Sequence, residues 1–200
     1  MDIIRRYQKE MRLYPLLLVL VVVLAILGRM PLEQVEVVRD YQGFLDALGM
    51  RESSNDYTAV NRFDYMGRYQ LGEEALSDAG FMDKKGNWTE KAHSYGIYSK
   101  SDFLASPAGQ DAAVTDYHRK LCVYIRYYGL AEYLGQIYRD VPVTQSGLLA
   151  ACHLVGVGSM KKALATGNVT YDGNRVPASE YLAMFADYDI TEVWGEEGEE

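Results

Sequence analysis

The stretch Glu52–Asn61 reads ESSNDYTAVN, and the stretch Gly67–Leu71 that soon follows reads GRYQL. Apolar side chains precede them at spacings of three and four, the pattern of an amphipathic helix with one buried stripe. These side chains are Val35, Val38, Tyr41, Phe44, Leu45 and Leu48. The pattern predicts a helix over residues 33–49, which places Glu52 on its last turn or just beyond it.

The residues after this helix, Ser53 to Gly72, are rich in Asn, Asp, Ser, Tyr and Gly and show no helical period. They predict a long loop or a small ribbon, and long ordered loops in compact domains are usually functional. Helical patterns then return. The expected helices are Glu73–Ala79, Ser106–Gly129, Leu130–Tyr138, Gln145–Val155 after a Thr144 cap, Ser159 to about Gly167, and Pro177 to about Asp187. Val169–Val176 predicts a hairpin that turns at Asp172-Gly173, so the expected fold class is mainly α with a small β hairpin.

An apolar run lies near the N-terminus, because Leu13–Gly28 carries no charged residue and is almost wholly Leu, Val, Ile and Ala. As a helix it spans about 24 Å, somewhat less than the roughly 30 Å hydrocarbon core of a bilayer, and the next few apolar residues extend it. Four basic residues precede the run, which predicts an uncleaved transmembrane helix with a cytoplasmic N-terminus. A cleaved signal peptide shares this pattern, although no A-x-A site follows, and a buried core helix is a third alternative. The expected organisation is a cytoplasmic basic segment at 1–12, an anchor at 13–32, an exported domain at 33–190 and an acidic tail at 191–200.

The composition of the chain, 48% hydrophobic and 24% charged, is typical of a globular protein. Beyond residue 30 the chain has 15 Lys and Arg against 26 Asp and Glu, which gives the exported part a net charge of −11. Nucleic-acid binding depends on basic residues that neutralise phosphates. The charge balance therefore argues against nucleic acid as a partner.

Two cysteines, Cys122 and Cys152, lie in apolar, helix-like segments. An oxidising compartment would permit a disulfide between them, and two buried unpaired thiols are an equally open alternative. The sequence has no C-x-x-C or H-x-x-x-H spacing. Neither a metal site nor a cofactor is therefore expected.

Glu52 is a candidate for acid catalysis at a glycosidic bond. Cleavage of such a bond requires a proton on the leaving oxygen and a means to handle the oxocarbenium-like carbon that remains. A Glu that lies against apolar surface can hold this proton at neutral pH, because desolvation raises its pKa. Glu52 follows Leu48, Gly49 and Met50 and could be so placed. A solvated Glu at a helix end is the alternative that local context leaves open.

The spacing around Glu52 resembles the first motif of the soluble lytic transglycosylases, a lysozyme-like family that cleaves peptidoglycan. That motif runs E-S-x-x-x-x-x-A-V-S-x-x-G-A-x-G-L-M-Q. Glu52-Ser53, Ala59-Val60, Gly67 and Gln70 fall at its positions without a gap. The resemblance implies a lysozyme-like α+β domain, and it covers about residues 33–165, more loosely in its second half.

The resemblance implies that Glu52 protonates the bond between N-acetylmuramic acid and N-acetylglucosamine. Glu52 would then act as a base on the muramic 6-hydroxyl, so that a 1,6-anhydro product forms. Ser53 and Gln70 are carried over as groups that line the sugar site. Three further candidates are added because aromatic rings and amides suit sugars. They are Tyr57, Asn61 and Tyr69.

The chain departs from the family pattern at several positions. Asp64 stands in place of the motif's Gly and adds a second carboxylate to the same loop. A carboxylate about 6.5 to 9.5 Å from Glu52 would permit inverting hydrolysis instead, with Asp64 as base. The family's later A-Y-N-A-G-x-G motif is matched only loosely by residues 151–158, where no Tyr stands. Its tyrosine is either missing or supplied from elsewhere; His153 is a candidate for that place, or else a core residue.

The leading hypothesis is a membrane-anchored, periplasmic lytic transglycosylase of a bacterial inner membrane that opens the cell wall locally. Its expected partners are peptidoglycan strands, the cytoplasmic membrane and an envelope-spanning machine for secretion, conjugation or phage entry. A hydrolytic muramidase that uses Glu52 with Asp64 is one alternative. The spacing of phage-type lysozymes fails, because it needs other residues at Asn61 and Gly67. A non-catalytic peptidoglycan-binding scaffold is the other alternative.

Overall fold

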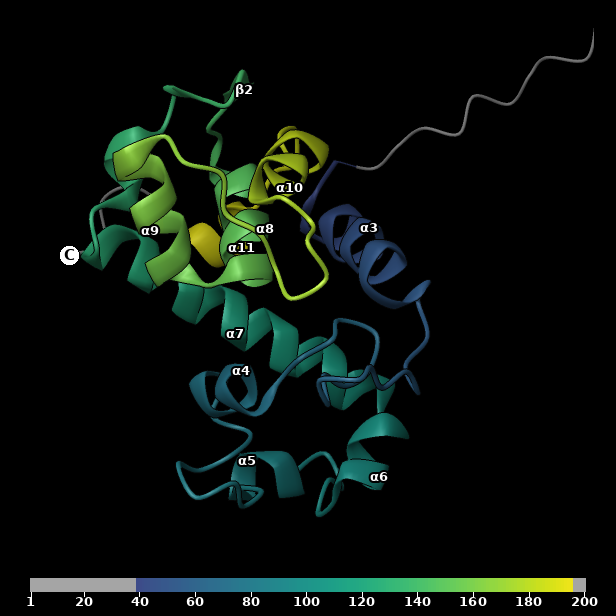
Figure 1. Ribbon diagram of the computed structural model, residues 1–200. Coiled ribbons are helices and arrows are strands. Elements are labelled where there is room, and N and C mark those ends of the chain that lie inside the picture. The colour runs from purple at the N-terminus through teal and green to yellow at the C-terminus, as the bar shows by residue number, and fades with distance from the viewer. Residues whose placement is uncertain (1–38, 196–200) are drawn as a thin grey trace, which may run out of the picture. The chain divides into compact units, whose positions relative to one another are not determined.

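The structure of the protein is a computed structural model, which describes residues 39–195 (Figure 1). The predicted basic segment at 1–12 and anchor at 13–32 lie outside the described residues. Within residues 39–195 the fold is mainly helical with one small antiparallel hairpin, as the sequence predicted. The helices are α3 (Tyr41–Ser53), α4 (Glu73–Asp78), α5 (Glu90–His93), α6 (Lys100–Leu104), α7 (Pro107–Tyr127), the 3-10 helix η1 (Leu130–Tyr133), α8 (Gln145–Val155), α9 (Val157–Thr166), α10 (Ala178–Met184) and α11 (Thr191–Trp194).

The predicted starts of α7 and α8 are confirmed, because a capping side chain fixes each of them. Ser106 Oγ accepts a hydrogen bond from the backbone N–H of Gly109 at 3.2 Å, and Pro107 occupies the first turn of α7. Thr144 Oγ1 caps α8 in the same way, at 3.1 Å from the backbone nitrogen of Gly147. Both helices therefore begin where the sequence indicates.

Helix α8 lies at the centre of the fold. Its residues 146–152 are all buried, and it contacts α7, α9 and α10. Gly147 permits the closest of these approaches, because a Cβ at this position would lie 2.5 Å from the carbonyl oxygen of Leu182 in α10. In Figure 1, α4, α5 and α6 lie on one side of the long helix α7, and α8, α9 and α10 lie on the other. Helix α3 approaches this second group through an aromatic contact of Phe44 with Phe185, 5.1 Å between ring centroids.

The hairpin lies at a different place from the one predicted. Strand β1 (Ile137–Tyr138) pairs with β2 (Val141–Pro142), in a segment whose first part was expected to be helical to Tyr138. The helix predicted for Leu130–Tyr138 is only the short η1. The predicted hairpin at Val169–Val176 is instead a loop closed by one isolated bridge, between Tyr171 and Pro177.

Several boundaries also differ from the sequence predictions. The helix predicted over residues 33–49 is α3, which begins at Tyr41 after the Asp40 cap and continues to Ser53. The last predicted helix is shorter than expected and ends at Met184. Helix α9 begins at Val157 rather than at Ser159. The acidic tail predicted from residue 191 begins with α11, whose Val193 and Trp194 are buried. The Arg126 guanidinium of α7 donates a hydrogen bond to the Trp194 carbonyl at 2.7 Å, so this segment belongs to the packed domain.

No single helix within residues 39–195 is long and apolar enough to cross a membrane. Helices α8 and α9 reach the required length and composition only as a pair, and this pair is bent by 117°. Most of α8 is buried in the protein core.

Candidate active site

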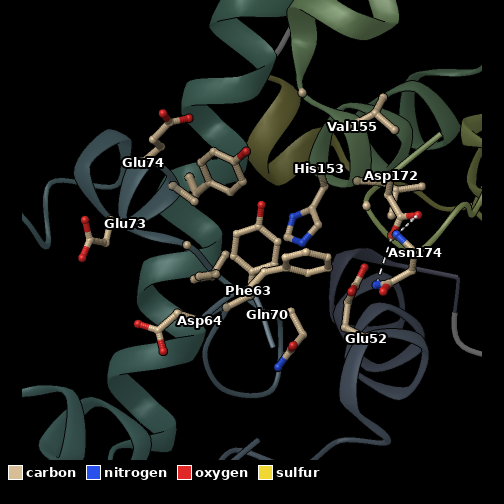
Figure 2. Close-up of a pocket in the computed structure, with 18 of the residues that line it drawn as sticks. Glu52, Phe63, Asp64, Gln70, Glu73, Glu74, His153, Val155, Asp172 and Asn174 are labelled. Carbon is tan, nitrogen blue, oxygen red and sulfur yellow. Dashed lines mark hydrogen bonds between the residues drawn. The ribbon is translucent and has the colours of Figure 1, made fainter. Parts of the chain in front are cut away.

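Glu52 lies on the last turn of α3 and lines a cleft of about 750 Å³. The other cleft walls come from the loop before α4, the first turn of α4, Tyr117 of α7, the C-terminal end of α8, and the 171–174 loop. Figure 2 shows Glu52 directed toward this space, with Asn174 and Asp172 on the same side of the view and His153 and Phe63 near its centre. The predicted catalytic carboxyl therefore faces a cavity large enough for part of a polymeric ligand.

Tyr181 in α10 donates a hydrogen bond from its hydroxyl to Glu52 Oε1 at 2.7 Å. Burial raises the pKa of Glu52 to about 7. The hydrogen bond from Tyr181 and the Arg51 guanidinium lower this pKa, and the Asp172 carboxylate raises it. Glu52 thus exists in both protonation states near neutral pH, as a group that first gives and then takes a proton must.

An ion pair joins the end of α3 to α10. Arg51 Nη2 lies 2.7 Å from Glu180 Oε1, and the Arg51 guanidinium lies over the Tyr181 ring, 5.6 Å from its centroid. These contacts bring Tyr181 to Glu52, although 129 residues separate the two in the sequence. Tyr181 is the main site residue that the sequence predictions missed. The missing motif tyrosine is the only sequence signal for a residue supplied from elsewhere in the chain.

We expect Tyr181→Phe to move the alkaline limb of the pH–rate profile to higher pH, by up to about one unit. The hydroxyl hydrogen bond favours the ionised form of Glu52, so its loss raises the pKa further. For the activity proposed below, initial rates of glycan release across pH 5 to 9 measure this shift. Tyr138→Phe is the matched control, since the Tyr138 hydroxyl donates to the Asn168 carbonyl and does not line the cleft. An unchanged profile in Tyr181→Phe would remove Tyr181 from the site.

Gln70 lines the cleft as predicted, and Ser53 does not. Gln70 Nε2 donates to the Gly67 carbonyl at 3.0 Å. Ser53 Oγ donates to the Arg68 carbonyl at 2.9 Å and accepts from the backbone N–H of Asp56. Ser53 therefore connects the end of α3, which carries Glu52, to the following loop.

Gly67 has a structural reason for its place in the motif. Its φ is +73°, and a Cβ here would lie 2.0 Å from Gln110 Oε1. The Gln110 side chain accepts from the backbone N–H of Arg68 and donates to the carbonyls of Tyr57 and Phe103. A glycine at this position thus lets α7 fix the loop that carries Gln70.

Tyr57, Asn61 and Tyr69, which were added as sugar ligands, form hydrogen bonds with other groups of the protein. Tyr69 is only 1% exposed, and its hydroxyl donates to Asp111 at 2.7 Å. Tyr57 also donates to Asp111, and Asn61 Oδ1 accepts from the backbone N–H groups of Phe63 and Tyr65. None of the three lines the cleft. Their polar groups hold the loop together, so their assignment as sugar ligands is corrected.

Arg68 organises this part of the loop. Its guanidinium is nearly buried and donates to Asn55, Tyr57, Tyr69 and Asp46, the last at 2.6 Å. A buried guanidinium requires such partners, because an unpaired buried charge is strongly destabilising. The aromatic residues that suit a sugar by type are thereby directed toward an arginine.

Asp64 lines the cleft, but its side chain is exposed and pairs with Lys100 in α6. In Figure 2 the Asp64 and Glu52 carboxylates lie on different sides of the view. The carboxylate whose charge acts on Glu52 is Asp172. Asp172 accepts hydrogen bonds from the backbone N–H of Asn174 and Val176 and from the Asn174 side chain, which keeps it engaged in its own turn.

His153 lines the cleft at the end of α8, but both of its ring nitrogens have protein partners. Nε2 lies 3.1 Å from the Tyr69 carbonyl, and Nδ1 lies 3.1 Å from Nε2 of the buried His118. His153 therefore does not take the place of the motif tyrosine beside Glu52. It is a hydrogen-bonded histidine at the edge of the core.

The two cysteines are unpaired buried thiols, so the disulfide alternative is excluded in this structure. Burial raises the pKa of Cys122 to about 12 and that of Cys152 further. Both thiols therefore stay protonated and unreactive at neutral pH. Within residues 39–195, no three His, Cys, Asp or Glu side chains are grouped so that they could hold a metal ion.

Comparison with known proteins gives no assignment. No family model matches the chain, and no curated protein or solved structure shows significant similarity to it. The function is therefore inferred from the site itself.

Proposed function

We propose that the domain is a lysozyme-like lytic transglycosylase that cleaves the β-1,4 bond between N-acetylmuramic acid and N-acetylglucosamine in peptidoglycan. The observation that carries the proposal is the Glu52 carboxyl, which faces a cleft, has its pKa raised to about 7 and accepts a hydrogen bond from Tyr181. Perturbed carboxyl groups in clefts are candidates for acid–base catalysis. The ungapped spacing from Glu52 to Gln70 supports the same assignment.

In the proposed mechanism, protonated Glu52 gives its proton to the glycosidic oxygen as the bond to the muramic C1 breaks. The leaving sugar takes the bonding electrons and departs as an alcohol. Glu52, now ionised and stabilised by the Tyr181 hydroxyl, then removes the proton from the muramic 6-hydroxyl. The 6-oxygen bonds to C1 and closes the 1,6-anhydro ring, and Glu52 returns to its protonated state.

The polar contacts of Asp64 and Asp172 favour this anhydro-forming route over hydrolysis. An inverting hydrolase needs a second carboxylate free to activate water opposite the acid. Asp64 pairs with Lys100, and both oxygens of Asp172 accept hydrogen bonds within the 172–176 turn. One carboxyl group with a raised pKa suffices for the transglycosylase sequence, and Glu52 supplies it.

The proposed setting is the outer face of a bacterial inner membrane. The apolar run at 13–32 would anchor the chain with its N-terminus in the cytoplasm, and the domain would reach the cell wall in the periplasm. Tethering would confine cleavage to a thin layer beside the membrane. It would also suit a role beside an envelope-spanning secretion, conjugation or phage machine.

Digestion of purified peptidoglycan sacculi by the full-length chain in mild detergent, followed by mass spectrometry, tests the proposal. We expect soluble fragments with 1,6-anhydromuramic ends. Fragments with reducing ends would replace the transglycosylase with a hydrolytic muramidase. Binding to sacculi without any release would indicate a scaffold domain and overturn the enzymatic assignment.

We expect Asp64→Asn to retain at least about half of the wild-type rate, because the Asp64 side chain is exposed and paired with Lys100. The release of soluble muropeptides from sacculi measures this rate. Lys100→Gln is a useful companion, since it frees the same carboxylate without removing it. A loss of about two orders of magnitude in Asp64→Asn, with reducing ends in the wild-type products, would make Asp64 the base of a hydrolase.

A further inference from the structure

Three aromatic side chains of the cleft are exposed to solvent. Phe63 is 45% exposed, Tyr65 is 46% exposed and Tyr171 is 55% exposed, and all three line the cavity that Glu52 faces. Phe63 and Tyr65 come from the loop after α3, whereas Tyr171 comes from the loop before α10. Single exposed rings are ordinary on a protein surface, but exposed aromatic side chains gathered at one cavity indicate a binding surface.

The loop positions of two of these rings are fixed by glycines. A Cβ on Gly72 would lie 2.7 Å from the Tyr65 ring, and a Cβ on Gly173 would lie 3.2 Å from the Phe63 ring. Each ring thus packs one side against backbone. The Phe63 contact also joins the two loops, since Gly173 belongs to the loop that carries Tyr171.

Arg62 adds a second contact between the loops. Its Nη2 donates to Asn174 Oδ1 at 3.1 Å and to the Gly173 carbonyl at 3.5 Å. The guanidinium also lies over the Phe63 ring, 4.7 Å from its centroid. The aromatic groups of the two loops are therefore held in one arrangement before any ligand binds, which lowers the entropy cost of binding.

The charged side chains of the cleft are all acidic. Among the described residues that line it, Glu52, Asp64, Glu73, Glu74 and Asp172 are carboxylates, and none is Lys or Arg. Figure 2 shows Glu73 and Glu74 on the side of the cavity opposite Glu52. A glycan with carboxylates on its sugar rings would be repelled here, whereas hydroxyl and amide N–H groups would find acceptors.

We infer that Phe63, Tyr65 and Tyr171 form an aromatic platform for the pyranose rings of an N-acetylated β-linked glycan strand whose sugar rings carry no charge. This inference rests on the proposed function and specifies the substrate class of the same site. The apolar faces of the sugar rings pack on the aromatic faces, and the hydroxyl and acetamido N–H groups donate to the carboxylates around them. The cleft thereby selects the glycan backbone by its lack of charge.

Binding to the Glu52→Gln variant of the full-length chain tests charge selection separately from cleavage. Isothermal titration calorimetry compares chitohexaose, which is uncharged, with a hyaluronan hexasaccharide, which carries carboxylates on alternate sugars. We expect chitohexaose to bind at least about tenfold more tightly in low salt. The ratio of the two dissociation constants should fall in 1 M NaCl, where the screening length drops to about 3 Å. Equal affinities in low salt, or tighter binding of hyaluronan, would overturn the selection.

Substitutions in the same Glu52→Gln background test the platform. We expect Phe63→Ala and Tyr171→Ala each to raise the Kd for chitohexaose about 5- to 10-fold, the factor of one aromatic contact. Tyr171→Phe should recover most of the affinity lost in Tyr171→Ala, since the ring face makes the contact. Tyr127→Ala is the matched control, because Tyr127 is 79% exposed and lies outside the cleft. Unchanged affinity in both alanine variants, with thermal unfolding also unchanged, would remove the platform.

The two proposals fail in different ways. If the wild-type chain releases no fragments from sacculi but the variants lose chitohexaose binding as expected, the platform stands and the catalytic assignment fails. If the wild-type chain produces anhydro ends but Phe63→Ala and Tyr171→Ala bind as tightly as their parent, the catalytic assignment stands and the platform fails.

Discussion

Glu52→Gln should lower the rate of fragment release from sacculi by about 10³-fold, the contribution typical of a positioned general acid. Glutamine has nearly the same shape as protonated glutamate and can still accept the hydrogen bond from Tyr181, so the fold should persist. It cannot, however, give a proton to the glycosidic oxygen. Muropeptide release measured by chromatography reports the loss. Wild-type rates in this variant would be incompatible with Glu52 as the acid.

The same substitution should stabilise the protein at pH 8. The pKa of Glu52 is about 7 in the folded state and about 4.5 in the unfolded chain, so the folded state disfavours the ionised form. This cost is fully present above pH 7, shrinks as the pH falls toward 4.5, and is absent below it. From the pKa difference it amounts to roughly 3 kcal/mol at pH 8.

Chemical denaturation at pH 8 and pH 5 measures this effect. Glu52→Gln should raise the free energy of unfolding by roughly 3 kcal/mol at pH 8 and by less than about 1 kcal/mol at pH 5. Glu132→Gln serves as the control, since Glu132 is exposed and lies outside the cleft. An equal change at both pH values would mean that the ionisation of Glu52 is not the cause. A gain in stability together with a loss of activity is expected when a catalytic carboxylate is destabilised by burial.

Local capping chemistry made several elements of the fold predictable. Ser106-Pro107 and Thr144 place their helix starts through contacts within one turn, so the sequence alone determines α7 and α8. The prediction of the β hairpin was wrong for an equally local reason. Its turn residues Arg139 and Asp140 both have positive φ, which Asn-Gly or Asp-Gly ordinarily signals. Arg-Asp carries no such signal, whereas Asp172-Gly173 carries it without forming paired strands.

The site was predictable only where one segment supplies it. Glu52 and Gln70 lie in a single continuous stretch, and both line the cleft. Tyr181 reaches Glu52 only through the packing of α10, which no short-range pattern encodes. Residue type alone also could not say which tyrosines face the cleft. Arg68 holds Tyr57 and Tyr69 in the loop, and Tyr65 and Tyr171 are exposed instead.

The second large effect is expected at acid pH, from the buried pair His118 and His153. The Tyr69 carbonyl can only accept, so His153 Nε2 carries its proton and His153 Nδ1 accepts from His118 Nε2–H. His118 Nδ1 then accepts from the Tyr41 hydroxyl at 3.0 Å. Both rings are neutral in this series of hydrogen bonds. A second proton on either ring would place a charge in a buried site and reverse at least one of these hydrogen bonds.

Burial lowers the pKa of His153 to about 4 and that of His118 well below its ordinary value. In the unfolded chain both titrate near 6.5, so the unfolded state binds more protons below that pH. Their stabilising contribution is therefore fully present above pH 6.5 and is lost as the pH falls toward their folded pKa values. Between pH 6.5 and its folded pKa, each histidine should lower the free energy of unfolding by about 1.4 kcal/mol for each unit that the pH falls. Glu52 acts in the opposite direction between pH 7 and 4.5 and hides part of the loss.

The Glu52→Gln background isolates the histidine pair, since it removes that opposing titration. In this background the free energy of unfolding, measured by urea titration, should fall by roughly 2.7 kcal/mol per unit between pH 6 and 5. His153→Gln should halve this slope, whatever it does to stability at pH 8. His93→Gln should leave the slope unchanged, because His93 stacks on Tyr98 outside the chain of hydrogen bonds. A slope that His153→Gln does not alter would show that the loss of stability in acid arises outside this pair of histidines.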